Sequence, residues 1–270
     1  MKKIILITGA SAGMGKDFAR ELVKDGHTVY GAARRLGQMD DLKALGVKTI
    51  KMDVTDEASM VQGITDIIEA EGGVDVLINN AGFGSYGAIE DVSIQDAKYQ
   101  LDVNVFGAAR LAQLVIPQMR KQHFGRVINI SSIGGKFALP LGGWYHASKF
   151  ALEALSDALR NEVKPFGIDV VVIEPGGVKS EWSDIAMDNL VKISGNGVYS
   201  KMAKKLAGMS KTQGHRAAGP EVITKLIKKA IEAKNPKTRY TGGFAAKPLL
   251  FLRKILSDRM MDKLFMSQLK

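Results

Sequence analysis

The chain has 270 residues, 46% of them hydrophobic, and a formal net charge of +10. That length is enough for one sizeable core, and α/β folds of this size commonly form a single domain. Because the chain has no cysteine, disulfides, thiolate catalysis and cysteine-ligated metal sites are excluded. No stretch approaches the roughly 18 apolar residues of a membrane span. We therefore expect a cytoplasmic protein.

Basic residues are concentrated in the last quarter of the chain. Residues 201–270 contain 17 Lys and Arg against 4 Asp and Glu, a net charge of +13, which leaves −3 for residues 1–200. Solvated helix faces are the simplest explanation, and an acidic substrate or carrier or an anionic membrane surface are the alternatives. We expect no nucleic acid as a partner, because no aromatic residues suited to base stacking are interleaved with the basic ones.

Short β-rich apolar runs alternate with longer segments of helical period along most of the chain. Several runs are apolar without alternation, which is typical of strands covered on both faces. This series predicts an α/β fold, namely one Rossmann-type domain over residues 1–270 with a doubly wound parallel sheet of about seven strands and helices on both faces. The predicted strands are Lys3–Thr8, Thr28–Ala33, Lys48–Met52, Val74–Asn79, Arg126–Ser131, Asp169–Glu174 and Thr238–Thr241. The predicted helices are 14–25, 39–45, 56–71, 93–122, 143–164 and 220–234.

Two later segments fall outside this alternation. Residues 176–218 are rich in Gly, Ser, Lys and Met, and we predict irregular structure there. Because they follow a strand at the edge of the sheet where such folds bind ligands, we also predict a substrate lid. Residues 244–270 have apolar residues on several sides of a helix, which predicts a helical extension packed on the body of the protein or on a neighbouring subunit. A basic, apolar surface anchor is the alternative.

A glycine-rich loop follows the first predicted strand. It reads Thr8-Gly9-Ala10-Ser11-Ala12-Gly13-Met14-Gly15, and a helix begins within it. Glycine permits a tight turn and a close approach of the backbone to a ligand, and the N–H groups at a helix N-terminus attract phosphate. The spacing Gly-x-x-x-Gly-x-Gly differs from the common dinucleotide fingerprint, but its position between strand and helix predicts a dinucleotide site.

The end of the second predicted strand indicates which dinucleotide binds. NAD sites usually place a carboxylate here for the ribose 2′-hydroxyl, whereas an arginine accommodates the 2′-phosphate of NADP. The sequence Ala33-Arg34-Arg35 has two guanidinium groups and no carboxylate, and guanidinium forks bind phosphate oxygens well. We therefore predict NADP(H), bound by Arg34 first and Arg35 second, with Ser11 as a further phosphate contact.

Tyr145 and Lys149 are one helical turn apart in a segment of helical period. Residues i and i+4 share a face of a helix. A phenol with a pKa of about 10 is a poor base at neutral pH, but a neighbouring ammonium favours the phenolate and lowers that pKa. The pair alone is common by chance, and its place in a nucleotide-binding chain makes it a candidate acid/base.

Together these motifs resemble the short-chain dehydrogenase/reductase family over about residues 3–180. The further motifs that carry the resemblance are Asp53-Val54 after the third strand, Asn80-Ala81-Gly82 after the fourth, Asn104 in the long helix, and Pro175-Gly176 after the sixth. Ser132 precedes Tyr145 by 13 residues, a separation typical of the family's catalytic serine, so we select it over Ser131.

The resemblance implies a role for each residue. Tyr145 would be the general acid/base, Lys149 would lower its pKa and bind the nicotinamide ribose, and Ser132 would stabilise the substrate oxygen. Asn104 would hold a water that links Lys149 to solvent. The implied cofactor contacts are Gly9, Ser11, Gly13, Met14, Gly15, Arg34, Arg35, Asp53, Val54, Asn80, Ala81, Gly82, Tyr145, Lys149, Pro175, Gly176, Val178 and Ser180. Ser180 stands where the family has threonine, so the hydroxyl is kept and the stiffening methyl is lost.

The resemblance implies an enzyme that transfers a hydride between NADP(H) and a carbonyl or alcohol. Pocket walls predicted in Phe83–Tyr86, Phe137–Trp144 and 181–215 are rich in aromatic residues, which favours a fairly apolar substrate of steroid-like, retinoid-like, aryl or acyl type. A 3-oxoacyl group on an acidic carrier protein is the main alternative, and a non-catalytic NADP(H)-binding regulator is a lesser one. We expect no metal site, and a homodimer or homotetramer formed through the long helices.

Overall fold

The structure, a computed structural model that describes residues 1–269, contains a seven-stranded sheet in the order β3-β2-β1-β4-β5-β6-β7. All neighbouring strands are parallel. The strands are β1 (Ile4–Thr8), β2 (Thr28–Ala33), β3 (Lys48–Lys51), β4 (Val76–Asn79), β5 (Gly125–Ile130), β6 (Ile168–Pro175) and β7 (Arg239–Gly242). The chain winds outward in both directions from the β1/β4 pair, so the predicted doubly wound sheet is confirmed.

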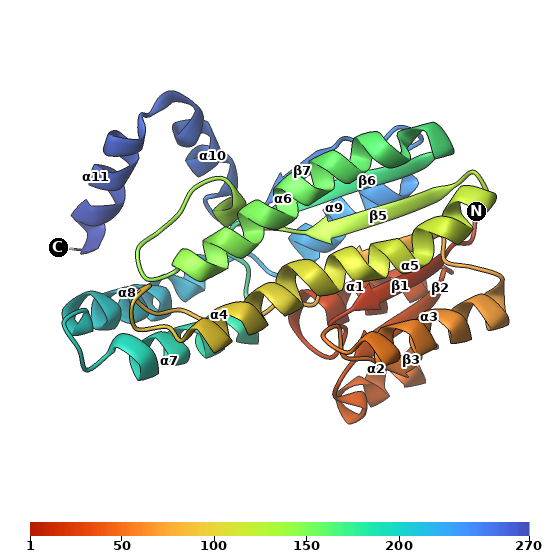
Figure 1. Cartoon of the computed structure of the whole chain (residues 1–270), viewed down its shortest axis with the longest axis horizontal. Helices are drawn as coiled ribbons and strands as arrows, with labels where there is room; N and C mark the ends of the chain where they lie inside the picture. The colour runs from red at the N-terminus through yellow and green to blue at the C-terminus, as the bar shows by residue number, and fades with distance from the viewer. Residues whose placement is uncertain (270) are drawn as a thin grey trace.

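Helices cover both faces of the sheet (Figure 1). The α-helices are α1 (Gly13–Lys24), α2 (Asp40–Ala44), α3 (Glu57–Glu71), α4 (Ile94–Leu101), α5 (Gly107–Lys121), α6 (Gly143–Val163), α7 (Glu181–Ser194), α8 (Ser200–Gln213), α9 (Glu221–Glu232), α10 (Ala246–Ile255) and α11 (Asp258–Leu269). A π-helical turn, Asp102–Phe106, joins α4 to α5. The long helix predicted over 93–122 is therefore present, with a widened turn in its middle.

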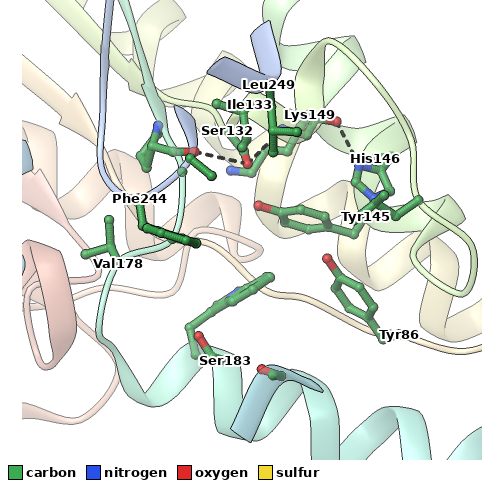
Figure 2. Close-up of a pocket in the computed structure, with 18 of the residues that line it drawn as sticks. Tyr86, Ser132, Ile133, Tyr145, His146, Lys149, Val178, Ser183, Phe244 and Leu249 are labelled. Carbon is green, nitrogen blue, oxygen red and sulfur yellow. Dashed lines mark hydrogen bonds between the residues drawn. The ribbon is translucent and has the colours of Figure 1, made fainter. Parts of the chain in front are cut away.

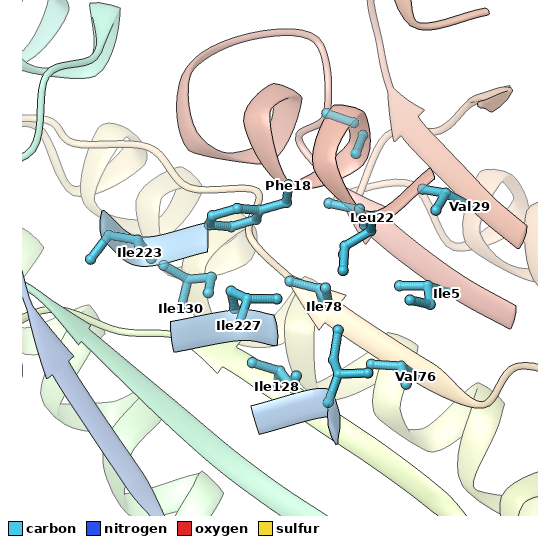
Figure 3. Packing of buried hydrophobic residues seen from close by; sticks show 14 of the residues in the cluster. Ile5, Phe18, Leu22, Val29, Val76, Ile78, Ile128, Ile130, Ile223 and Ile227 are labelled. Carbon is cyan, nitrogen blue, oxygen red and sulfur yellow. The ribbon is translucent and has the colours of Figure 1, made fainter. Parts of the chain in front are cut away.

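Two hydrophobic clusters hold the layers together. Ile5 and Ile7 of β1 lie in one cluster with Phe18 of α1 and Ile227 of α9 (Figure 3). Leu6, between them in sequence, lies in the other cluster with residues of α3 and α5 such as Leu111. Successive side chains of a strand point to opposite faces, so a strand covered on both sides must be apolar at every position. This explains why the predicted strands show little alternation.

The prediction of irregular structure over 176–218 was wrong, because the segment contains α7 and α8. Ala186, Met187 and Leu190 of α7 are buried together with Ala203 and Ala207 of α8, at spacings that repeat every three to four residues. The two helices pack against each other. The small alanines and the many glycines and lysines concealed this apolar stripe in the sequence.

The chain ends in a second helical hairpin, α10 and α11, which lies at the same end of the molecule as α7 and α8 (Figure 1). It contacts the body through α10 with β7 and with the turn after β5, and through α11 with α8. Within residues 1–269, no helix is both long and apolar enough to cross a membrane.

Candidate active site

Two adjoining cavities lie at the carboxyl edge of the sheet. The larger has a volume of about 800 Å³ and the smaller about 230 Å³, and both have Asn80, Gly82 and Phe83 in their walls. This edge, where strand order reverses between β1 and β4, is where doubly wound sheets bind ligands. A single extended ligand can therefore occupy both cavities.

The smaller cavity brings together predicted contacts from four segments of the chain. It is lined by the predicted nucleotide contacts Gly9, Ser11, Arg34, Arg35, Asp53, Val54, Asn80, Ala81 and Gly82. The other predicted contacts Met14, Pro175, Gly176, Val178 and Ser180 line the larger cavity. Gly13 and Gly15 lie in the first turn of α1 and line neither cavity. The two groups of predicted contacts thus lie in succession along one continuous space.

Backbone packing at the end of β1 requires glycine. Gly9 has a φ of +67°, and a Cβ placed on it would lie 2.9 Å from the Cα of Ala81. The hydroxyl of Thr8 accepts hydrogen bonds from the backbone N–H groups of Asn80 and Ala81 at 3.1 and 3.0 Å. The Asn80 side chain in turn donates to the Thr8 carbonyl at 2.9 Å. These bonds fix the loops after β1 and β4 against each other and leave the cavity above them.

The N-terminus of α1 faces this loop without a side-chain cap. Ala12 is the N-cap residue, no side chain accepts a hydrogen bond there, and the first turn has no acidic residue. The first N–H groups of a helix lack intrahelical partners and carry a partial positive charge. They are therefore available to an anion, which is the property that the glycine loop predicted.

The two arginines after β2 differ in their contacts. The Nη1 of Arg34 donates to the Tyr99 hydroxyl at 2.8 Å and lies 3.9 Å from Asp53 Oδ2. The Arg35 guanidinium is exposed and has no ion pair or hydrogen bond within residues 1–269. Both line the smaller cavity. Arg35 is thus the cation free to take an anion, whereas the sequence ranked Arg34 first.

Ser132, Tyr145 and Lys149 meet in the larger cavity (Figure 2). Ser132 follows β5, and the other two lie on adjacent turns of α6. The Ser132 hydroxyl accepts from the Gly134 N–H at 3.0 Å and donates to the Pro175 carbonyl over 3.5 Å, a long contact. Its proton is therefore held loosely and can turn to another acceptor.

Lys149 is buried, and its Nζ donates to the carbonyl of Ile130 at 2.8 Å. It lies 6.0 Å from the ring centroid of Tyr145. Burial lowers the pKa of Lys149 to about 8, while the Glu153 carboxylate one turn further on opposes this change. Desolvation disfavours the charged form of any buried group. The ammonium is therefore close to losing its proton at mildly alkaline pH.

Burial has the opposite effect on Tyr145. It raises the pKa of Tyr145 to about 12, and a hydrogen bond with Ser132 lowers it in part. The expected lowering of this pKa by Lys149 stays a prediction, because burial sets the net direction in the protein by itself. The phenol is enclosed by apolar side chains, and the ammonium is held by the Ile130 carbonyl, so desolvation of the phenolate outweighs the attraction of the distant charge.

Asn104 lies in the π-helical turn, a feature that is rare and frequent at functional sites. Its amide donates to the Phe83 carbonyl at 2.8 Å and to the Ser148 hydroxyl at 2.9 Å, and its oxygen accepts from the Phe83 N–H at 2.7 Å. A Cβ on Gly82 would lie 3.7 Å from its Oδ1 and 3.9 Å from Lys149 Nζ. Asn104 thus joins the loop after β4 to α6 directly behind Lys149.

The wall of the larger cavity is mostly aromatic and aliphatic. Trp182, at the start of α7, lies over Tyr145 with ring centroids 4.9 Å apart and meets Tyr86 at 6.0 Å. Of the predicted wall residues, Phe83, Tyr86, Phe137, Leu139 and Trp182 line the cavity, whereas Leu141 and Trp144 do not. Trp182 therefore brings the α7–α8 hairpin directly onto the reactive tyrosine.

The sequence did not assign the C-terminal helices to this wall. Leu249 of α10 and Phe265 and Leu269 of α11 line the larger cavity, and the Phe265 ring stacks on Phe137 at 5.3 Å. The signal was present as apolar residues on several sides of the last helical segment, which predicted burial on several sides. Nothing in that pattern indicated which surface they would cover.

Two buried polar residues support the site from behind. The Nδ1–H of His146 donates to the Gly134 carbonyl at 2.9 Å and holds the turn after Ser132. Burial lowers the pKa of His146, so the ring is neutral. Glu153 accepts from Lys136 at 2.7 Å and from Arg239 at 3.0 Å. These contacts fix α6, and with it Tyr145, relative to β7 and the turn after β5.

Comparison with known proteins agrees with this geometry. A family model described as short chain dehydrogenase matches residues 3–211. The 3-ketodihydrosphingosine reductase of Bacteroides thetaiotaomicron is 37% identical over 96% of this chain and 95% of its own. The NADPH-dependent 3-dehydrocapnine reductase of Ornithobacterium rhinotracheale is 33% identical over 98% and 96%. A short-chain dehydrogenase from Streptomyces avermitilis has 31% identity and a TM-score of 0.82 over 97% and 96%. The chain therefore belongs to the short-chain dehydrogenase family.

Proposed function

We propose that the protein is an NADP(H)-dependent reductase of a carbonyl group on a fairly apolar substrate. The larger cavity carries this proposal, because the Ser132 and Tyr145 hydroxyls lie in a wall that is otherwise dominated by aromatic and aliphatic side chains. Its volume of about 800 Å³ is within the usual range for pockets that enclose a whole small molecule.

The residues around the two cavities fit a nicotinamide dinucleotide. The uncapped start of α1 and Ser11 would hold the phosphates, and Asp53 and Val54 would flank the adenine. Arg35 and Arg34 would bind the 2′-phosphate that distinguishes NADP from NAD. Lys149 would bind the nicotinamide ribose, beside Pro175, Val178 and Ser180. NADPH would supply the hydride, which no side chain can provide.

The protein's own contribution is to position the carbonyl and deliver its proton. Because the pKa of Tyr145 is about 12, the phenol is protonated at neutral pH and can donate to the carbonyl oxygen. The loosely held Ser132 proton would donate to the same oxygen as negative charge develops. The Lys149 ammonium would favour the phenolate that remains. A phenol that is already protonated suits reduction better than oxidation.

The substrate class rests on the cavity and on the relatives. Two of them are named as reductases of 3-ketodihydrosphingosine and 3-dehydrocapnine, which supports reduction of a carbonyl group. A long apolar chain suits a cavity wall built partly by α10 and α11. A 3-oxoacyl group on an acidic carrier remains the second candidate. It is favoured by the exposed Arg216 in the cavity wall, since a cation at this position would attract an acidic partner.

The test is a ketone panel followed by NADPH and NADH consumption. We expect long-chain and aryl ketones to be reduced with NADPH preferred, and Tyr145→Phe to lower kcat by at least a hundredfold while NADPH binding stays within a fewfold. Tyr240→Phe, which removes a hydroxyl from β7 outside both cavities, is the matched control. Activity of Tyr145→Phe within a fewfold of the parent would refute the assignment. Turnover by the parent would exclude a non-catalytic NADP(H)-binding regulator.

We further infer a homodimer or homotetramer formed through the long helices, in the cytoplasm. Large apolar side chains are exposed on the π-helical turn, at Phe106, and on α6, at Phe150 and Leu155. Such surfaces are commonly covered by another subunit. The absence of cysteine supports a reducing compartment. Sedimentation velocity of the parent, in which a monomer would contradict the proposal, tests the assembly.

A further inference from the structure

The two helical hairpins at the carboxyl end of the sheet border the larger cavity from opposite sides. Trp182 and Leu206 of α7 and α8 line it, as do Leu249, Phe265 and Leu269 of α10 and α11. The hairpins touch where α8 packs against α11, and both lie at one end of the molecule (Figure 1). Their outer faces therefore flank the same cavity.

The outer face of α10 mixes lysines with large apolar side chains. A helix turns by about 100° per residue, so Lys247, Phe251, Lys254 and Ile255 share one face. Phe251 and Ile255 are 62% and 60% exposed. Leu249, on the opposite face, lines the cavity. One helix thus presents an apolar and basic surface outward and the cavity wall inward.

Helix α8 has the same basic character as α10. Lys201, Lys204 and Lys211 are exposed on one face of α8 and form no ion pair within the described chain, and α8 has no acidic residue. Val198, just before it, is 90% exposed. On α11, Met260 is 52% exposed, and the exposed Arg259 and Lys263 are balanced by Asp258 and Asp262. The positive charge of α8 and α10 is therefore combined with exposed apolar side chains beside the cavity.

We propose that the outer faces of α8, α10 and α11 dock on an anionic lipid membrane, from which an apolar substrate passes between the hairpins into the cavity. Apolar side chains inserted at the headgroup boundary, with lysines above them, are the pattern of an interfacial helix. Lysines at such a surface are attracted by anionic lipids. The proposed docking depends only on the residues of these faces, whereas the proposed entry of substrate also rests on the proposed function.

Two other occupants fit the surface less well. A second copy of the chain would bring the unpaired lysines of α8 against lysines of the same kind, which is unfavourable. An acidic carrier protein would satisfy the lysines, but it would leave Phe251, Ile255 and Val198 without the apolar phase that a lipid supplies. The combination of charge and exposed apolar area therefore favours a membrane.

The test is co-sedimentation of the full chain with vesicles. We expect binding to phosphatidylcholine vesicles that contain phosphatidylglycerol, little binding to pure phosphatidylcholine, and weaker binding at high salt. Each lysine removed costs roughly fivefold in affinity, so Lys201→Gln with Lys204→Gln lowers binding about 25-fold. Phe251→Ser with Ile255→Ser weakens binding to the same vesicles. Lys43→Gln with Lys121→Gln and, for the apolar pair, Val61→Ser are the controls and bind as the parent does.

The outcomes separate the two proposals. All these variants should reduce a short, water-soluble ketone with NADPH at the parent rate, so a parent that binds vesicles and reduces no ketone refutes only the proposed function. Equal binding to both kinds of vesicle, or no loss in either docking variant, overturns the membrane surface. Loss of the oligomer in Phe251→Ser with Ile255→Ser, without a change in vesicle binding, also overturns it. So does binding of an acidic acyl carrier protein by a parent protein that does not bind vesicles.

Discussion

Burial of the charged Lys149 should lower the free energy of unfolding of the cofactor-free protein, compared with a neutral side chain at the same position. The ammonium is enclosed beside Ile130 and Tyr145, and burial lowers its pKa from the ordinary value of 10.5 to about 8. At about 1.4 kcal/mol per pKa unit, the difference between these two values corresponds to about 3 kcal/mol of unfolding free energy below pH 8. Lys149→Met, which keeps most of the side-chain length and removes the charge, should relieve that cost.

The sign follows from proton binding. Between pH 8 and 10.5 the unfolded chain holds the Lys149 proton and the folded protein has released it, so stability rises with pH in this window. From pH 7 to pH 10 we expect the parent to gain about 2–3 kcal/mol relative to Lys149→Met. Loss of the hydrogen bond to the Ile130 carbonyl costs the variant about 1–3 kcal/mol, but that cost does not depend on pH.

Urea unfolding of both proteins at pH 7, 8, 9 and 10 measures this difference. The free energy of unfolding of the parent should rise with pH relative to that of Lys149→Met, because the two proteins share all other titrating groups. Lys149→Arg, whose charge persists through this range, is the control, and its free energy of unfolding should not rise in this way. Parallel pH dependence of the parent and Lys149→Met would refute the idea that a desolvated ammonium is maintained at the expense of stability.

Three further results are expected. Arg35→Ala should raise KM for NADPH about tenfold or more and leave KM for NADH unchanged, since a charge-assisted hydrogen bond contributes about 1.5–3 kcal/mol; equal changes for both would place the 2′-phosphate elsewhere. Trp182→Ala should raise KM for long apolar ketones about tenfold and spare kcat for a small ketone, because its ring covers Tyr145 and Tyr86; a uniform loss would indicate misfolding. The kcat/KM for reduction should fall as pH rises through about 8, where Lys149 loses its charge, and a flat profile to pH 10 would remove the ammonium from the reaction.

The fold could be predicted because its signals are local. Each strand is an apolar run between helices of clear period, and successive residues such as Leu6 and Ile7 pack into opposite hydrophobic clusters. The prediction was wrong at α7 and α8, where alanines supply the buried stripe and composition suggested a loop. Small side chains bury well only when a partner helix comes close, and that partner lies within the same hairpin.

The nucleotide and catalytic motifs were also visible in the sequence, because a glycine loop, a strand-end arginine pair and a Tyr-x-x-x-Lys turn each need fixed spacing. The structure adds their electrostatic state. The direction of the change in the Tyr145 pKa depends on everything that excludes water from the phenol, including Trp182 from a distant segment, and no spacing within α6 contains that information.

The sequence by itself determined the seven strands, most of the helices, the reaction family and the residues that lie at the carboxyl edge, since these follow from periodicity and short motifs. Only the tertiary structure decided that α10 and α11 close the substrate cavity with Leu249, Phe265 and Leu269, and that Arg35 rather than Arg34 is the free cation. Both depend on which surfaces meet after folding. Such contacts join residues far apart in the chain, and an amphipathic pattern shows that a face will be covered without showing by what.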